Sequence, residues 1–184
     1  AESHVYKRQG QLRLSPSTRT LIAANWNVAQ KVTVTATDGA VVEDPHNAAI
    51  THSTSSSDAN YSAIPMAGIT VAITDNDSPG VIVTESSGGT AVTEGGANDN
   101  YSVALTTQPT SAVTVTVSGD AQATANPTVL VFTPANWNIP QDVTVAAVDD
   151  LVAEPPHTGQ ITHAAVSSDP DYNGIPVDGV TAHI

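Results

Sequence analysis

The stretch FTPANWNIPQDVTVAAVDDLVAE, residues 132–154, occurs a second time in the chain as LIAANWNVAQKVTVTATDGAVVE, residues 21–43. Trp26 and Trp137 are 111 positions apart, and the same offset aligns the two copies without a gap over residues 16–73 of the first copy. A fixed period over that length indicates duplicated structural units that solve the same burial problem. The sequence therefore predicts a tandem array.

The period divides the 184 residues into one nearly complete unit and part of another. Residues 1–13 match nothing in the second copy and carry a basic cluster foreign to the rest, so we expect a junction segment that is not part of the repeat. Residues 14–78 are expected to be a partial repeat without its opening strands. Residues 79–184, which follow the turn signal around Pro79, are expected to be a nearly complete repeat.

Composition and periodicity indicate an all-β fold. Aromatic residues make up only 4% of the chain, whereas the β-compatible residues Val and Thr are abundant, and no window has a convincing helical period. In the second unit, apolar and polar residues alternate in short segments bounded by turn residues, which is typical of an immunoglobulin-like antiparallel β-sandwich of about seven strands with Greek-key connections. The expected strands are 81–84 continuing through a Ser-Ser-Gly-Gly kink to 90–93, then 100–106, 112–118, 129–133, 142–148, 157–166 and 177–184.

The charge balance limits the possible partners. The chain has 18 Asp and Glu against five Lys and Arg, a net charge of −13, and no Lys or Arg follows Lys31. Nucleic acid and anionic membrane are poor partners for such a surface, and no apolar run is long enough for membrane insertion. Because the chain has no Cys, it has no disulfide framework and no thiolate metal site.

Strand alternation places many of the carboxylates at one end of the predicted sandwich. If successive strands run in opposite directions, the connections after the first, third and fifth strands meet at the same end, and these connections are acidic. The acidic residues concerned in the second unit are Glu94, Asp120, Asp149, Asp150 and Glu154. Solvated acidic loops are one explanation, and a bound divalent cation is the other, since calcium takes six to eight loop oxygens without strict geometry.

The sequence also resembles the Calx-beta domain of sodium/calcium exchangers and of large bacterial surface proteins. The motifs that carry this resemblance are TEGG (93–96), FTPANWNIPQDVTV (132–145), DDLVAE (149–154) and TDND (74–77). The resemblance implies a seven-stranded sandwich that binds Ca2+ at one end. The implied ligands are Glu94, Asp120, Asp149, Asp150 and Glu154 in the second unit, and Asp38, Glu43, Asp75 and Asp77 in the first. The first unit departs from the pattern, because Gly39 replaces the second Asp of its Asp-Asp pair.

Other residues admit both a functional and a structural interpretation. The loops with Trp137 and Tyr172 are predicted to lie at the opposite end, where the two rings would either stack on a sugar or cap the core, and capping is the favoured interpretation. His157 and His163 share a strand face but are too far apart for one metal ion, so both are expected to be structural. No nucleophile or metalloprotease motif occurs, and nothing places a cleft around the carboxylates, so no enzyme is predicted.

These observations together predict a function. The chain is expected to be a calcium-binding structural or adhesive repeat of a large extracellular or cell-surface bacterial protein, with calcium stiffening the junction between units. Its expected partners are neighbouring repeats of the same chain, together with a host, matrix or glycan ligand. The alternative is an accessory carbohydrate-binding module of a secreted hydrolase, with Trp137 and Tyr172 as sugar contacts.

Overall fold

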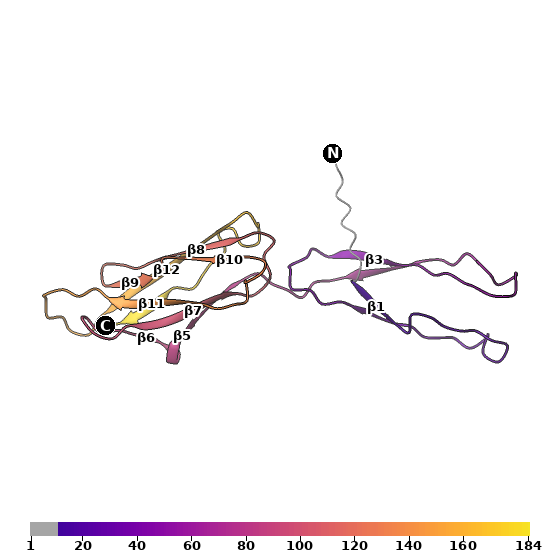
Figure 1. The fold of residues 1–184 in the computed structure, drawn as a ribbon, viewed down its shortest axis with the longest axis horizontal. Helices are drawn as coiled ribbons and strands as arrows, with labels where there is room; N and C mark the ends of the chain where they lie inside the picture. The colour runs from indigo at the N-terminus through magenta and orange to yellow at the C-terminus, as the bar shows by residue number, and fades with distance from the viewer. Residues whose placement is uncertain (1–10) are drawn as a thin grey trace. The chain divides into compact units, whose positions relative to one another are not determined.

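The computed structural model describes residues 11–184, so most of the predicted junction segment lies outside the described residues. The regular secondary structure of the described chain is almost entirely β, and the chain divides into two compact units (Figure 1). Unit 1 comprises the described residues up to Gly39 together with Glu43–Asp75, and unit 2 comprises Ala40–Val42 together with Asn76–Ile184.

Unit 2 is a β-sandwich of two sheets. Its elements are β5 (Val81–Glu85), η1 (Ser86–Gly88), β6 (Thr90–Ala91), β7 (Asp99–Leu105), β8 (Val113–Ser118), β9 (Ala123–Asn126), β10 (Val129–Phe132), β11 (Gln141–Ala147), β12 (Thr158–Ser167) and β13 (Val180–His183). One sheet has the order β5-β7-β11-β9 and the other has the order β10-β8-β12-β13-β6. Because the chain crosses between sheets from β7 to β8 and from β11 to β12, the predicted immunoglobulin-like Greek key is confirmed.

Alternation along the strands builds the core. In β8, Val113, Val115 and Val117 are buried, whereas the alternate residues Thr114, Thr116 and Ser118 are not. β7 and β11 follow the same period, so side chains from both sheets meet between them. Tyr101, Phe132 and Tyr172 are the largest fully buried side chains of this core.

The first strand of unit 2 contributes to both sheets. β5 pairs with β7 in one sheet, and β6 pairs in parallel with β13 in the other. Two hydrogen bonds hold the kink between β5 and β6: Thr90 Oγ1 donates to Glu85 Oε2 over 2.7 Å, and Ala91 N donates to Asp99 Oδ2 over 2.9 Å. The predicted continuation through a Ser-Ser-Gly-Gly kink is therefore confirmed.

Unit 1 has two separate pairs of strands. β1 (Leu12–Ser15) pairs with β2 (Thr33–Ala36), and β3 (His46–Ile50) pairs with β4 (Ile69–Ile73). Each register equals that of unit 2 shifted by 111 residues: β1 and β2 pair as β9 and β11 do, and β3 and β4 pair as β12 and β13 do. The two units therefore repeat each other in strand register as well as in sequence. β1 also crosses the boundary predicted after Arg13, because sequence identity between the units fades before the shared backbone pairing does.

Candidate metal centre

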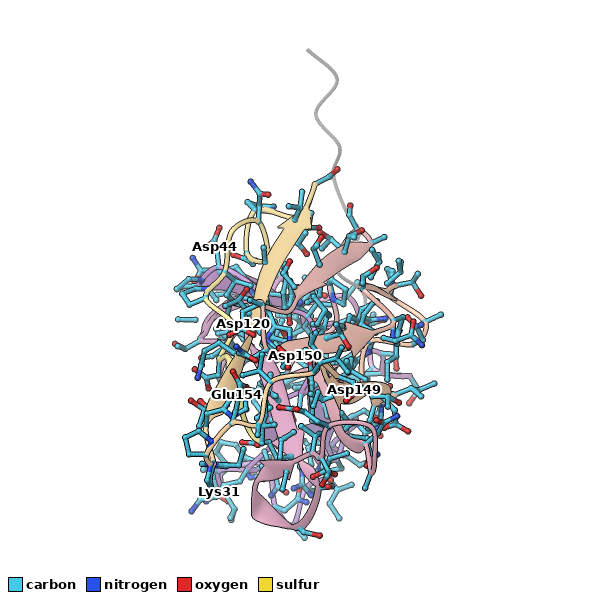
Figure 2. The ribbon with its side chains drawn as sticks, turned by 90° about the vertical axis from the view of Figure 1, so that its left-hand side faces the viewer. Lys31, Asp44, Asp120, Asp149, Asp150 and Glu154 are labelled. Carbon is cyan, nitrogen blue, oxygen red and sulfur yellow. The ribbon has the colours of Figure 1, made fainter. Side chains whose placement is uncertain are left out.

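The predicted carboxylates of unit 2 gather at one end of the sandwich. We call this end the acidic end; it consists of the loops 92–98, 119–122 and 148–157, which follow β6, β8 and β11. Figure 2 looks onto this end and shows Asp120, Asp149, Asp150 and Glu154 on it. Strand pairing explains the gathering of the last two loops. β12 runs antiparallel to β8 and β11 runs antiparallel to β9, so β8 and β11 end at the side of the sandwich where β9 and β12 begin.

Backbone hydrogen bonds position Glu94. The preceding strand is fixed to β13, because Val92 N donates to His183 O over 2.9 Å. The chain then turns sharply: Gly95 has φ +59°, and Gly96 N donates to Thr93 O over 3.0 Å. The left-handed conformation at Gly95 suits glycine and directs the side chain before it to the acidic end.

Glu154 reaches the same point from the other long loop, beside His157. His157 Nε2 lies 3.3 Å from Glu154 Oε2 and 3.8 Å from Glu94 Oε1. One ligand atom from each of these three residues lies within 4.8 Å of the other two. Two carboxylates that are far apart in the sequence therefore converge on one imidazole; we call these three residues the Glu-Glu-His cluster.

The hydrogen bonding of His157 gives the cluster its electrostatic character. The second ring nitrogen, Nδ1, lies 3.0 Å from the carbonyl oxygen of Pro155, so Nδ1 carries the proton and donates it there. In the neutral ring, Nε2 then presents a lone pair to two carboxylates, and this buried atom has no hydrogen-bond partner. Either a proton or a metal ion at Nε2 turns the repulsion into attraction. Metal-ligating histidines are typically oriented by such a bond from the other nitrogen to a carbonyl.

Asp149 and Asp150 lie on the loop that carries Glu154, and their surroundings differ. A Cβ atom placed on Gly95 would lie 3.4 Å from both carboxylate oxygens of Asp149, so that carboxylate lies next to the turn that carries Glu94. Asp150 is bonded within its own loop, where its Oδ1 accepts from Val152 N over 2.6 Å. Asp149 is therefore the closer of the two to the turn at Glu94 through the contacts that the structure shows.

Asp120 performs a structural task that the sequence did not predict. Its Oδ1 accepts from Gln122 N and Ala123 N, each over 2.9 Å, and its Oδ2 accepts from Gln160 N over 2.7 Å. Burial opposes ionisation, but these backbone hydrogen bonds outweigh it and lower the pKa of Asp120 below its ordinary value. The carboxylate thereby ties the β8–β9 loop to β12.

The corresponding place in unit 1 contains a glutamine. Glu43 and His46 are the repeats of Glu154 and His157, and between them lies Gln11, whose Nε2 donates to Glu43 Oε2 over 2.9 Å and whose Oε1 contacts His46 Nε2. Asp75 Oδ2 accepts from Glu43 N over 2.7 Å, so the structure brings these two predicted ligands together.

Asp38 and Asp77 are the other two ligands predicted for the first unit. Asp38 lies exposed after β2, and Asp77 belongs to unit 2. The predicted set of four stays a prediction.

The structure decides the role of one predicted sugar contact. Tyr172 is buried, its hydroxyl donates to Thr107 O over 2.8 Å and accepts from Thr107 N over 3.1 Å, and no face of the ring is free for a sugar. The carbohydrate-binding alternative is wrong about Tyr172. Trp137 is half-buried against the core. The capping interpretation is therefore confirmed for Tyr172.

The two histidines of the β12 segment differ in role. His163 is bonded within the protein: its Nε2 lies 2.7 Å from the hydroxyl of Tyr101, and its Nδ1 lies 2.7 Å from Asp178 O. It is structural, as predicted. His157 was also predicted to be structural, yet it lies between two of the predicted ligands. A signal for this was present in the sequence, because a glutamate stands three residues before the histidine in both copies, as Glu43–His46 and Glu154–His157.

Comparison with known proteins adds little to these observations. The sequence matches no family model and no curated protein. One similar solved structure is that of SSP-19, an MSP-domain protein like family member in Caenorhabditis elegans. It is 12% identical, with a TM-score of 0.34, over 52% of this chain and 91% of that one. Over residues 11–184, no helix has the length and apolar character needed to cross a membrane.

Proposed function

We propose that the chain is a calcium-binding structural repeat of a large extracellular or cell-surface protein, and that unit 2 holds the ion at the acidic end. The observation that carries this proposal is the convergence of Glu94 and Glu154 on the buried, unpartnered Nε2 of His157. Unit 2 contains no Lys or Arg, so its only basic side chains are histidines. A divalent cation neutralises these carboxylates directly.

Two properties of the cluster favour different ions. The carboxylates of Glu94 and Glu154, with that of Asp149 next to the same turn, supply the hard oxygen ligands that calcium takes in loops. The imidazole nitrogen is a ligand that zinc accepts more readily than calcium does. Calcium is the ion we propose, because carboxylates outnumber the imidazole and lie on loops that can adjust their geometry. In this role the ion fixes the loops at one end of each repeat. An array of repeats fixed in this way keeps a defined shape, and this shape supports adhesion.

Thermal unfolding of the whole chain tests the proposal. Calcium is expected to raise the Tm of unit 2, and ligand linkage gives about 2.7 kcal/mol of added stability at a hundredfold excess over Kd. The double variant Glu94→Gln/Glu154→Gln should lose this gain, whereas Asp142→Asn, which changes an exposed acid on β11, should retain it. Isothermal titration with Ca2+, Mg2+ and Zn2+ would be run in parallel.

The other outcomes have defined meanings. A response to Zn2+ alone that disappears in His157→Gln would make the imidazole the deciding ligand and would contradict the calcium proposal. An unchanged Tm with all three ions would mean that the Glu-Glu-His cluster binds none of them. In that case the acidic end would be a solvated surface, and the proposal would fail.

A further inference from the structure

The two units differ at the place that the repeat assigns to one glutamate–histidine pair. In unit 1 the side chain of Gln11 bridges the pair, since its Nε2 donates to Glu43 Oε2 over 2.9 Å and its Oε1 contacts His46 Nε2. The repeat of Gln11 is Gln122, and it does not bridge the pair of unit 2, because His157 Nε2 is buried and has no hydrogen-bond partner. A neutral polar side chain therefore satisfies the imidazole in unit 1, and the described residues of unit 2 offer it none.

The ring of His157 is held in one orientation by its surroundings. Its Nδ1 donates to Pro155 O over 3.0 Å. The main chain at His157 pairs with Ile184 in both directions, with N–O distances of 3.2 and 2.9 Å. Histidines that bind metals typically donate the other ring N–H to a carbonyl or carboxylate, which fixes the tautomer and the direction of the free lone pair. The lone pair of Nε2 is thus preorganised as a ligand.

Two carboxylates face this nitrogen at distances that suit a small cation. His157 Nε2 lies 3.3 Å from Glu154 Oε2 and 3.8 Å from Glu94 Oε1, and the three ligand atoms all lie within 4.8 Å of one another. Ligands held tetrahedrally at about 2.0–2.2 Å from zinc are separated from each other by about 3.3–3.6 Å. The distances from His157 are close to that range, and a zinc site then needs one further ligand, whereas calcium needs about six to eight oxygens.

We propose that the Glu-Glu-His cluster also binds Zn2+, through His157 Nε2 and one oxygen each of Glu94 and Glu154, and that zinc and calcium exclude one another there. The inference rests on the proposed function in that both place a divalent cation at the acidic end. Imidazole suits zinc and carboxylate oxygens suit calcium, so His157 contributes to zinc binding above all. Because both ions need the two glutamates, the concentrations of the two cations decide which ion fixes the loops.

Cobalt spectroscopy on the full chain tests the coordination of the ion. Co2+ substitutes for Zn2+ in such sites, and it absorbs visible light strongly when four-coordinate and weakly as the octahedral hydrated ion. The parent chain with one equivalent of Co2+ should show the strong absorption, and one equivalent of Zn2+ should abolish it. Weak absorption throughout the titration would contradict the proposed three-residue site.

Competition calorimetry tests the mutual exclusion. Zn2+ would be titrated into the full chain with and without Ca2+, at about a hundredfold excess of Ca2+ over its Kd. If the two ions share the glutamates, calcium should weaken the apparent zinc affinity by about a hundredfold. An apparent zinc affinity that does not change with calcium would overturn the proposed exclusion.

Two matched histidine variants locate the zinc site. His157→Gln should lower the zinc affinity by at least about tenfold, since loss of a second-shell partner alone typically costs that much. It should change the calcium affinity less, because glutamine offers an oxygen that calcium accepts. His46→Gln changes the repeat of the same histidine in unit 1, where Gln11 bridges the pair, and should leave the zinc affinity as in the parent chain.

The zinc site and the proposed function fail in different ways. Stabilisation by calcium together with equal zinc affinities in His157→Gln and the parent chain would overturn the zinc site and leave the calcium proposal standing. Zinc binding that depends on His157 in a chain that does not respond to calcium would contradict the calcium proposal and the mutual exclusion, and the cluster would be a zinc site alone.

Discussion

His163 is a half-buried titratable residue of unit 2 whose protonation should matter for folding. Its Nδ1 donates to Asp178 O, so its Nε2 must accept from the Tyr101 hydroxyl, an arrangement possible only for the neutral ring. Burial lowers the pKa of His163, and the bond to Asp178 O opposes this in part. Because the folded pKa lies below the unfolded value of about 6.5, the stability of unit 2 should fall as the pH drops below about 6.5.

Urea unfolding between pH 7.5 and 5 would measure this dependence. His163→Gln should flatten the slope of unfolding free energy against pH in that range, since the titrating group is gone. His52, its repeat in unit 1, bonds to Ala67 O but is exposed, and His52→Gln should leave the slope of unit 2 as it is. An unchanged slope in His163→Gln would show that other groups set the acid sensitivity.

A second residue-level prediction concerns Gly159 at the start of β12. A Cβ atom there would lie 2.6 Å from Ala123 Cβ and 3.1 Å from Ala123 N, too close for unstrained packing. Gly159→Ala should therefore destabilise unit 2 by about 1–3 kcal/mol, as overpacking does. Gly89→Ala is the control, because a Cβ at Gly89 meets nothing within 4 Å, and its Tm should be close to that of the parent chain. Equal Tm values for the two variants would mean that β9 yields to the extra methyl.

For the candidate site, the sequence could predict only which loops lie at the same end of the sandwich. Strand alternation correctly placed Glu94 and Glu154 at one end, because direction follows from counting strands. The task of Asp120 could not be foreseen, since its bond to Gln160 N joins residues 40 positions apart whose register no pattern reveals. The approach of His157 to both glutamates likewise depends on the backbone bond between His157 and Ile184.

Tyr172 ties two elements together at the end of unit 2 opposite the acidic end. Its hydroxyl joins the β12–β13 connection to Thr107, just after β7, through both backbone groups and Oγ1 of that threonine. Tyr172→Phe would leave these buried polar groups without a partner and should cost about 1–3 kcal/mol of unfolding free energy.

Denaturant melts would measure this cost against a matched variant. Tyr61→Phe changes the exposed repeat of the same tyrosine in unit 1 and should leave the unfolding of unit 2 unchanged. A loss of less than about 0.5 kcal/mol in Tyr172→Phe would mean that water replaces the hydroxyl, and that the tie adds little to stability.

Among the elements, the alternation of apolar and polar residues predicted the strands that have one apolar and one polar face. It missed β9, whose sequence lacks this alternation. β8 and β11 show clear alternation, and each was predicted to within one residue. β9, ATAN, has one fully buried residue and a polar sequence, so nothing marked it as a strand before its pairing with β11 was known. Its repeat β1 was not predicted either, and it begins at Leu12, two residues before the predicted start of the first unit.

At the scale of the whole molecule, the two units share strand registers but differ in burial, and this difference should appear as a difference in local stability. Unit 2 buries an apolar cluster between two sheets, whereas the described part of unit 1 buries one hydrophobic side chain. Backbone hydrogen bonds within a two-stranded pair that buries little apolar surface open easily, because an isolated hairpin is marginally stable in water.

Hydrogen exchange on the full chain would measure that difference directly. Amides of β7, β8, β11 and β12 should exchange slowly, with protection that reflects global unfolding of unit 2, while amides of β1–β4 should exchange within seconds at neutral pH, since their opening costs little. Each strand of unit 1 has a repeat with the same register in unit 2, so the exchange rates of the two strands can be compared in the same sample. If β2 and β3 were protected as strongly as β11 and β12, the duplicated strand pairs would be stable without the covering strands. Core burial would then not be what stabilises this fold.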